Sequence, residues 1–294
     1  MRNLLKRRHT PALTVAALIA LPAAMLCSLP LMATARAQTA KAAGADTAVV
    51  QDPAIVPASR MSVGWWAARH KQVLTEVASQ PDTQLLMIGD SITNNYEKTA
   101  PANQDLHPIW EQYYAPRKAL NLGFSGDTTA NVLWRLDHGE VAGLHPKLAV
   151  VLIGTNNTAF GQSAEETEEG IDAVVKDVEH RLPETKILLM GLLPTRMRSK
   201  DANFDVNAYL GSHYAGGEDP MVSYIDISVV FYTHGELDTS LFYDPTLTPP
   251  LPATHPNNYG QRLMASAIEP AVARLMGDER VKPSEVPFRS VGQP

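Results

Sequence analysis

The chain has 294 residues, with 25 basic and 31 acidic side chains, a formal net charge of −6 and one cysteine, Cys27. The acidic balance argues against a nucleic-acid partner, because phosphate binding needs clustered Lys and Arg. Cys27 lies in an N-terminal stretch that we expect to be removed, so disulfides, thiol catalysis and cysteine metal sites are excluded together.

Residues 1–37 have the pattern of a secretory signal peptide. A basic start at residues 2–8 precedes an apolar run at 11–32, and the small-x-small site Ala35-Arg36-Ala37 predicts cleavage before Gln38. Prolines interrupt the apolar run, so we expect no stable membrane insertion. Removal takes five basic residues and no acidic ones, which lowers the formal charge from −6 to −11. The sequence therefore predicts an exported protein, periplasmic or secreted, by general or twin-arginine export.

The rest of the chain divides into three parts. Residues 38–60 are rich in Ala, Thr, Asp and Pro without periodicity, which predicts a flexible linker. Residues 61–277 are enough for one domain with a substantial core, and 278–294 form a polar C-terminal tail.

Within the domain, short apolar runs alternate with helical patterns, which predicts βαβ units, a parallel sheet and three α/β/α layers. Five strands are expected, at 85–88, 119–122, 148–153, 187–193 and 222–227. Ser163 and Glu166 have capping-box spacing before a helix with an apolar stripe over 171–182. The last helix is expected directly after His255, with Pro256 in its first turn.

Polar motifs follow the first three strands, and parallel strands end at a common rim where open α/β sheets bind ligands. The first strand leads into Gly89-Asp90-Ser91, the second into Gly123-Phe124-Ser125-Gly126-Asp127, and the third into Gly154-Thr155-Asn156-Asn157. Each motif alone is equally a turn or a helix cap. Together they offer a hydroxyl, a glycine amide and a carboxamide, which acyl transfer requires.

The order of these motifs resembles the SGNH (GDSL-type) hydrolase family over residues 84–275. Gly89-Asp90-Ser91, Gly126, Gly154-x-Asn156 and His255 are similar to its sequence blocks, and Asn121–Leu136 and Val151–Asn157 resemble the catalytic subunits of intracellular platelet-activating-factor acetylhydrolases. The resemblance implies an α/β fold, a three-layer sandwich with a five-stranded, flavodoxin-like parallel sheet. It also implies Ser91 as nucleophile, His255 as base, and the Ser91 amide, the Gly126 amide and the Asn156 side chain as oxyanion hole.

One position departs from the family. The family has an aspartate three residues before the histidine, and here that position is Pro252. His255 is then oriented by Asp244, by a backbone carbonyl, or by no group at all. Asp244 is equally able to cap a turn with Pro245.

These observations predict a metal-independent carboxylic-ester hydrolase with no cofactor. The histidines lack ligand spacing, and no dinucleotide or phosphate-loop pattern is present. Its partner would be a small-molecule or carbohydrate ester, with a short acyl group implied by the resemblance. The alternatives are a secreted ligand- or carbohydrate-binding protein that has lost turnover, motivated by Pro252, and an acyltransferase. The sequence does not choose an oligomeric state.

Overall fold

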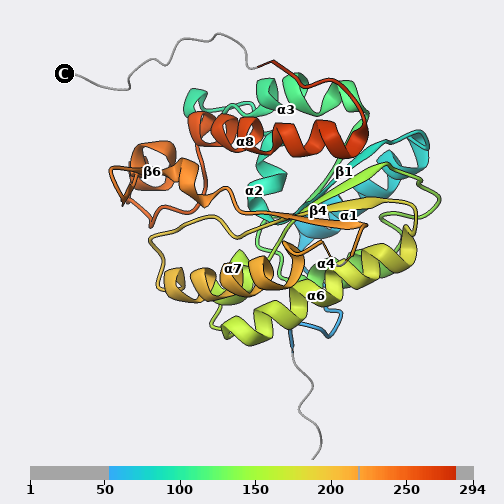
Figure 1. The fold of residues 1–294 in the computed structure, drawn as a ribbon, viewed down its shortest axis with the longest axis horizontal. Helices are drawn as coiled ribbons and strands as arrows, with labels where there is room; N and C mark the ends of the chain where they lie inside the picture. The colour runs from blue at the N-terminus through green and yellow to red at the C-terminus, as the bar shows by residue number, and fades with distance from the viewer. Residues whose placement is uncertain (1–52, 218, 283–294) are drawn as a thin grey trace, which may run out of the picture. The chain divides into compact units, whose positions relative to one another are not determined.

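The computed structural model describes residues 53–217 and 219–282, and the expected signal peptide lies outside them. A parallel sheet of five strands forms the centre, in the order β2-β1-β3-β4-β5 (Figure 1). The strands are β1 (Leu85–Gly89), β2 (Ala119–Gly123), β3 (Leu148–Leu152), β4 (Lys186–Met190) and β5 (Val222–Ile225). All five predicted strands are present, and the last three end earlier than predicted. This strand order is that of the flavodoxin-like sheet.

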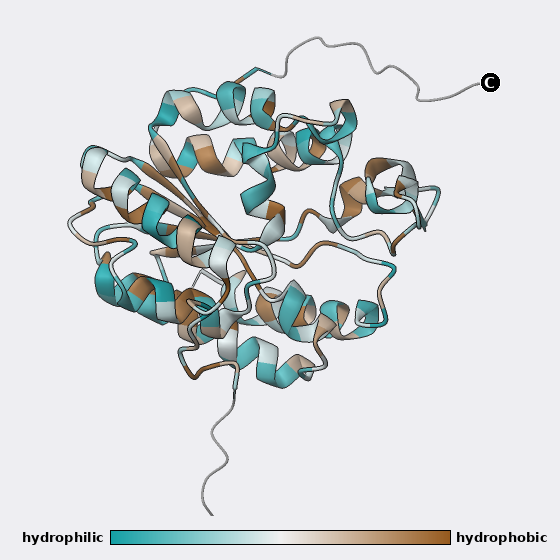
Figure 2. Cartoon of the chain, turned by 180° about the vertical axis from the view of Figure 1, so that it is seen from behind, coloured by the Kyte–Doolittle hydropathy of each residue, from teal (hydrophilic) through white to brown (hydrophobic). Residues whose placement is uncertain are grey.

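The strands are apolar along their whole length because the sheet is covered on both faces. Successive residues of β1 belong to different halves of the core: Leu86 and Ile88 pack in one cluster, Leu85 and Met87 in the other. Figure 2 shows the strands in brown at the centre, with polar residues on the outer surfaces of the helices. The sheet therefore separates two cores.

Helices form the two outer layers, which confirms the predicted sandwich (Figure 1). One core is closed by α1 (Gly64–Ser79), α4 (Thr129–Asp137), α6 (Ala164–Arg181) and α7 (Lys200–Tyr214). The other is closed by α3 (His107–Tyr113) and α8 (Asn258–Met276). The remaining elements are short: α2 (Ser91–Asn94), α5 (Thr155–Ala159), and the hairpin of β6 (Tyr232–Thr233) and β7 (Glu236–Leu237).

Side-chain caps mark the starts of α6 and α8. The predicted capping box forms before α6, where the Ser163 hydroxyl accepts from the Glu166 amide at 3.1 Å and the Glu166 carboxylate accepts from the Ser163 amide at 2.7 Å. The expected start of the last helix is wrong. Asn257 is the N-cap of α8, and its side chain accepts from two amides of the first turn. Pro256 lies before this cap and pairs with Phe242 instead.

Residues at both expected domain boundaries make contacts with the domain. Within the predicted linker, the Ala54 carbonyl accepts from Thr129 Oγ1 at 2.8 Å, and the Ala58 carbonyl accepts from Asn131 Nδ2 at 2.8 Å. In the predicted tail, Asp278 bonds Arg117 Nε at 2.7 Å. The folded unit therefore extends from Ala54 to beyond residue 277. Across the described residues, none of the helices has both the length and the apolarity to span a membrane.

Candidate active site

The site lies where strand order reverses. The chain goes from β1 outward to β2 and then returns to β3 on the other side of β1, so the carboxyl ends of these three strands are neighbours. α2, the turn at 124–128 and α5 follow these ends directly. The three predicted polar motifs therefore meet at one rim.

Ser91 is the first residue of α2. The Asp90 side chain caps this short helix by accepting from the Ile92 amide at 2.9 Å. Gly89, the last residue of β1, must be glycine, because a Cβ at this position would lie 2.5 Å from the Leu152 carbonyl oxygen of β3. This tight exit from β1 presents the Ser91 hydroxyl to His255, whose Nε2 lies 2.9 Å from Oγ. The predicted serine–histidine pair is thus assembled from residues 164 positions apart.

Asp244 completes this chain of contacts. Its Oδ1 lies 2.8 Å from His255 Nδ1, and its Oδ2 accepts from the backbone amides of His255 and Thr254. The Leu251 amide donates to the Asp244 carbonyl at 3.0 Å, which closes the proline-containing loop. Pro252 directly follows this closed loop. The acid is therefore eleven residues from the histidine in sequence but still contacts its ring. Of the three arrangements left open by the sequence, the structure has the first.

The charge state of Asp244 follows from these contacts. Burial by itself would raise the pKa of Asp244. The hydrogen bond and electrostatic attraction from His255, together with the backbone amides of His255 and Thr254, outweigh this effect, so the pKa of Asp244 lies below its ordinary value. The carboxylate is 2% exposed and stays ionised at neutral pH. A fixed negative charge therefore faces Nδ1 of the imidazole.

Asp90 has the opposite electrostatic environment. Burial raises its pKa to about 6, against the smaller lowering effects of the Ile92 amide and His255. Its Oδ2 has no hydrogen-bond partner among the described residues. A carboxyl group directly beside the nucleophile therefore has a pKa of about 6, well above its ordinary value.

Gly126 and Asn156 both line the cavity above Ser91. Gly126 has φ +77°, in the left-handed region that favours glycine, so the turn after β2 depends on this residue. Asn156 Nδ2 donates one hydrogen to the Asp127 carbonyl at 2.8 Å, which ties α5 to that turn. The cavity measures about 470 Å³, and its walls include Ser91, Lys98, Gly126, Asn156, Tyr243 and His255.

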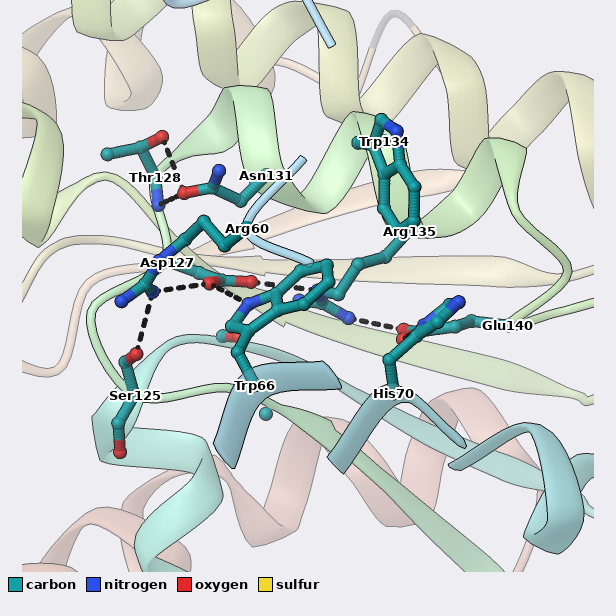
Figure 3. Close-up of polar contacts among 12 residues, drawn as sticks. Arg60, Trp66, His70, Ser125, Asp127, Thr128, Asn131, Trp134, Arg135 and Glu140 are labelled. Atoms are coloured by element: carbon teal, nitrogen blue, oxygen red, sulfur yellow. Dashed lines mark hydrogen bonds and ion pairs between the residues drawn. The ribbon is translucent and has the colours of Figure 1, made fainter. Parts of the chain in front are cut away.

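A buried network of charges holds the Gly126 turn, and Figure 3 shows it centred on Asp127. Arg60 Nη1 donates to the Ser125 carbonyl and to Asp127 Oδ1, both at 2.9 Å, so it binds the residues on either side of Gly126. Trp66 Nε1 donates to the same carboxylate at 2.7 Å, and Arg135 Nε donates to its other oxygen at 2.8 Å.

The network continues away from the site. Arg135 also pairs with Glu140, and Glu140 Oε1 lies 2.9 Å from His70 Nδ1 on α1. The side chains of Asp127, Arg135 and Glu140 are fully buried. Such groups are tolerated only because each has charged or hydrogen-bonding partners.

Sequence reasoning missed several of these residues. Arg60 falls in the stretch predicted as a linker, and Lys98 and Tyr243 follow no motif. Arg135 lies on α4 and pairs with Asp127 in the turn before that helix, and no motif in the sequence indicated this pair. No cluster of three or more metal-ligating side chains occurs in residues 53–217 or 219–282.

Comparison with known proteins identifies the family of this chain. The GDSL-like lipase/acylhydrolase family matches residues 87–263. Subunit alpha1 of human platelet-activating factor acetylhydrolase IB is 28% identical over 78% of this chain and 94% of its own length. Subunit alpha2 from chicken is 36% identical over 44% of this chain, and the match spans about half, 52%, of that relative.

A solved structure has the same fold. A GDSL-like lipase from Bacteroides thetaiotaomicron superposes with a TM-score of 0.55 over 70% of this chain and 98% of that one, at 22% sequence identity.

Proposed function

The chain belongs to the GDSL-like lipase/acylhydrolase family and is a serine esterase, and we propose that it cleaves short-acyl carboxylic esters through an acyl-enzyme on Ser91. The observation that carries the proposal is the unbroken series of contacts from Ser91 Oγ through the His255 ring to Asp244. This is the arrangement in which a serine hydroxyl becomes a nucleophile at neutral pH.

In the first half-reaction, Ser91 Oγ attacks the ester carbonyl carbon while its proton passes to His255 Nε2. Asp244 holds the proton on Nδ1 and stabilises the resulting imidazolium. The tetrahedral intermediate collapses, the alcohol takes the proton from Nε2, and the acyl group stays on Ser91. Water then repeats the sequence, releasing the acid and restoring the serine.

The oxyanion would be met by the Ser91 and Gly126 amides and by the Asn156 side chain. Asn156 Nδ2 carries two hydrogens and gives one to Asp127, so the other is available to the cavity that Asn156 lines. The Arg60–Asp127–Arg135 network keeps the Gly126 turn in place before substrate arrives. Donors fixed in advance stabilise charge that develops only in the transition state.

The acyl group is proposed to be acetyl or similarly short, because the curated relatives are named as acetylhydrolases. Acetylated sugars, small esters and acetyl-phospholipids all fit this description. We further propose export to the periplasm or beyond, from the N-terminal pattern. The non-catalytic alternative rested on Pro252, and the position of Asp244 beside His255 supports catalysis against it.

The test is hydrolysis of p-nitrophenyl acetate by the purified chain in the presence of a chelator. Activity should persist without metal, Ser91→Ala should abolish it, and a fluorophosphonate probe should modify Ser91 in a peptide map. Comparison with the octanoate ester tests the acyl preference, since a kcat/KM that rises from acetyl to octanoyl contradicts it. An added sugar or alcohol acceptor distinguishes a hydrolase from an acyltransferase by its products. Wild-type turnover in Ser91→Ala would refute the mechanism.

A further inference from the structure

We propose that Lys98, Tyr243 and Asn95 form a subsite for an anionic group, a carboxylate or a phosphate, on the ester substrate. The inference rests on the proposed function, because these three residues line the same cavity as Ser91 and His255. It adds a class of substrate that the hydrolytic machinery by itself does not specify.

The three side chains meet at the Tyr243 hydroxyl. Lys98 Nζ and Asn95 Nδ2 each lie 3.1 Å from this oxygen, and Nζ also lies 4.7 Å from the centre of the Tyr243 ring. The same ring stacks on the His255 imidazole, with centroids 5.3 Å apart and planes within 16°. The ammonium group is therefore held one aromatic ring away from the base.

Within residues 53–217 and 219–282, no acceptor is found for some of the hydrogens that this cluster can donate. The Tyr243 oxygen accepts from both Lys98 and Asn95, so its own hydrogen must point elsewhere. Burial raises the pKa of Tyr243 far above its ordinary value, and the hydroxyl therefore keeps that hydrogen. The Lys98 ammonium has three hydrogens, of which the Tyr243 oxygen takes one. An anion is the ligand that satisfies such a set.

The nearby carboxylates are engaged elsewhere. Both oxygens of Glu97 are bonded by Arg69, at 3.0 and 2.5 Å, and those of Asp244 are taken by His255 and Thr254. Asp244 attracts Lys98 through space and opposes the lowering of the Lys98 pKa by burial, but no ion pair joins Lys98 to any residue in the described ranges. A half-buried ammonium that lines a reaction cavity and makes no direct ion pair within the described residues is suited to charge-assisted hydrogen bonds to substrate.

The experiment uses two pairs of acetyl esters that differ in charge. The pair 4-acetoxybenzoate and 4-acetoxybenzamide tests a carboxylate, and the pair 4-acetoxyphenyl phosphate and phenyl acetate tests a phosphate. The measured quantity is the ratio of kcat/KM for the charged ester to that for the neutral one. We expect Lys98→Met to lower this ratio about tenfold in at least one pair, the typical effect of losing one charge-assisted hydrogen bond. Lys98→Arg, which keeps the charge, should retain most of it.

Lys147→Met is the matched control. Lys147 is exposed and directly precedes β3, at the opposite end of the sheet from the rim, and its loss changes the net charge equally. The ratio should not change in this variant. The inference is overturned if the charged-to-neutral ratio of kcat/KM is unchanged in Lys98→Met for both ester pairs. It is also overturned if the ratio falls equally in Lys98→Met and Lys147→Met.

Binding separates this inference from the proposed function. Calorimetry with 4-acetoxybenzoate is carried out on Ser91→Ala, with and without Lys98→Met. If the wild-type chain hydrolyses no ester but Ser91→Ala binds the charged ester in a Lys98-dependent way, the anion subsite stands and the esterase proposal fails. If the wild-type chain hydrolyses both pairs of esters with a ratio that does not depend on Lys98, the esterase proposal stands and the anion subsite fails.

Discussion

Replacing Asp244 by asparagine tests the acid at its relocated position, because it keeps the size of the side chain and removes its charge. All the donors around Asp244 are fixed: His255 Nδ1 at 2.8 Å from one oxygen, and the amides of Thr254 and His255 on the other. An asparagine can place its single oxygen against only one of these two sides. It should turn that oxygen toward the two backbone amides, which cannot move, and its NH₂ toward the imidazole.

That orientation forces the wrong tautomer of His255. An NH₂ group facing Nδ1 requires Nδ1 to accept, so the ring proton moves to Nε2, where it points at Ser91 Oγ. The base can then no longer take the serine proton. In a serine triad the corresponding change lowers kcat by about 10⁴, and we expect a loss between roughly 10² and 10⁴ here, with little change in KM.

The assay is steady-state hydrolysis of p-nitrophenyl acetate, with the unfolding midpoint measured to show that the variant is folded. Asp238→Asn is the control, because Asp238 lies in the same segment and its side chain accepts from the Ser240 amide at 3.0 Å and from the Ser240 and Thr233 hydroxyls. Asparagine also fills the capping role toward the Ser240 amide. If kcat of folded Asp244→Asn falls less than about threefold, the carboxylate has no catalytic role and the site is a Ser–His dyad.

Three further predictions follow from the same contacts. Asn156→Ala should lower kcat by roughly 10² to 10³ with KM nearly constant, because the lost donor meets charge present only in the transition state, and an unchanged kcat would remove Asn156 from the oxyanion hole. Asp90 has a folded-state pKa of about 6 against about 3.9 when unfolded, so the folded state binds its proton more tightly and stability falls as pH rises through this window. Relative to Asp90→Asn, the wild-type chain should lose about 2 kcal/mol of unfolding free energy between pH 4 and pH 7, and an equal difference in unfolding free energy between the two proteins at both pH values would contradict this. Glu140→Gln leaves the fully buried Arg135 charge with one ionic partner fewer and should cost about 3 kcal/mol in urea unfolding, whereas a loss below about 1 kcal/mol would show that Asp127 alone compensates Arg135.

The alternation of short apolar runs with helical stripes was enough to predict the fold. A strand buried on both faces needs unbroken apolar residues, and a surface helix needs a stripe, so both patterns are local properties of the sequence. The same holds for the rim. A motif directly after a parallel strand is carried to the carboxyl end of the sheet, which is why the motifs of Ser91, Gly126 and Asn156 could be placed at one rim. The roles of these three residues came from the resemblance to the hydrolase family.

Contacts between distant segments were not predictable in this way. Arg60 reaches Ser125 and Asp127 across more than sixty positions, and the composition of its segment carries no periodicity that marks it as packed. Lys98 and Tyr243 are 145 positions apart, and they meet because the segment after α2 and the loop before α8 both line the same cavity. Nothing in either local sequence indicates the other residue.

Asp244 shows where the two kinds of information divide. The sequence by itself determined that a carboxylate stood eleven residues before His255 and that the usual position was occupied by Pro252. Whether the intervening loop folded back was decided by the tertiary structure, through the Leu251 amide on the Asp244 carbonyl and two amides on its carboxylate. Local spacing fixes direction along a strand or helix, but a loop has no such repeat, so its path depends on the hydrogen bonds that the folded chain makes available.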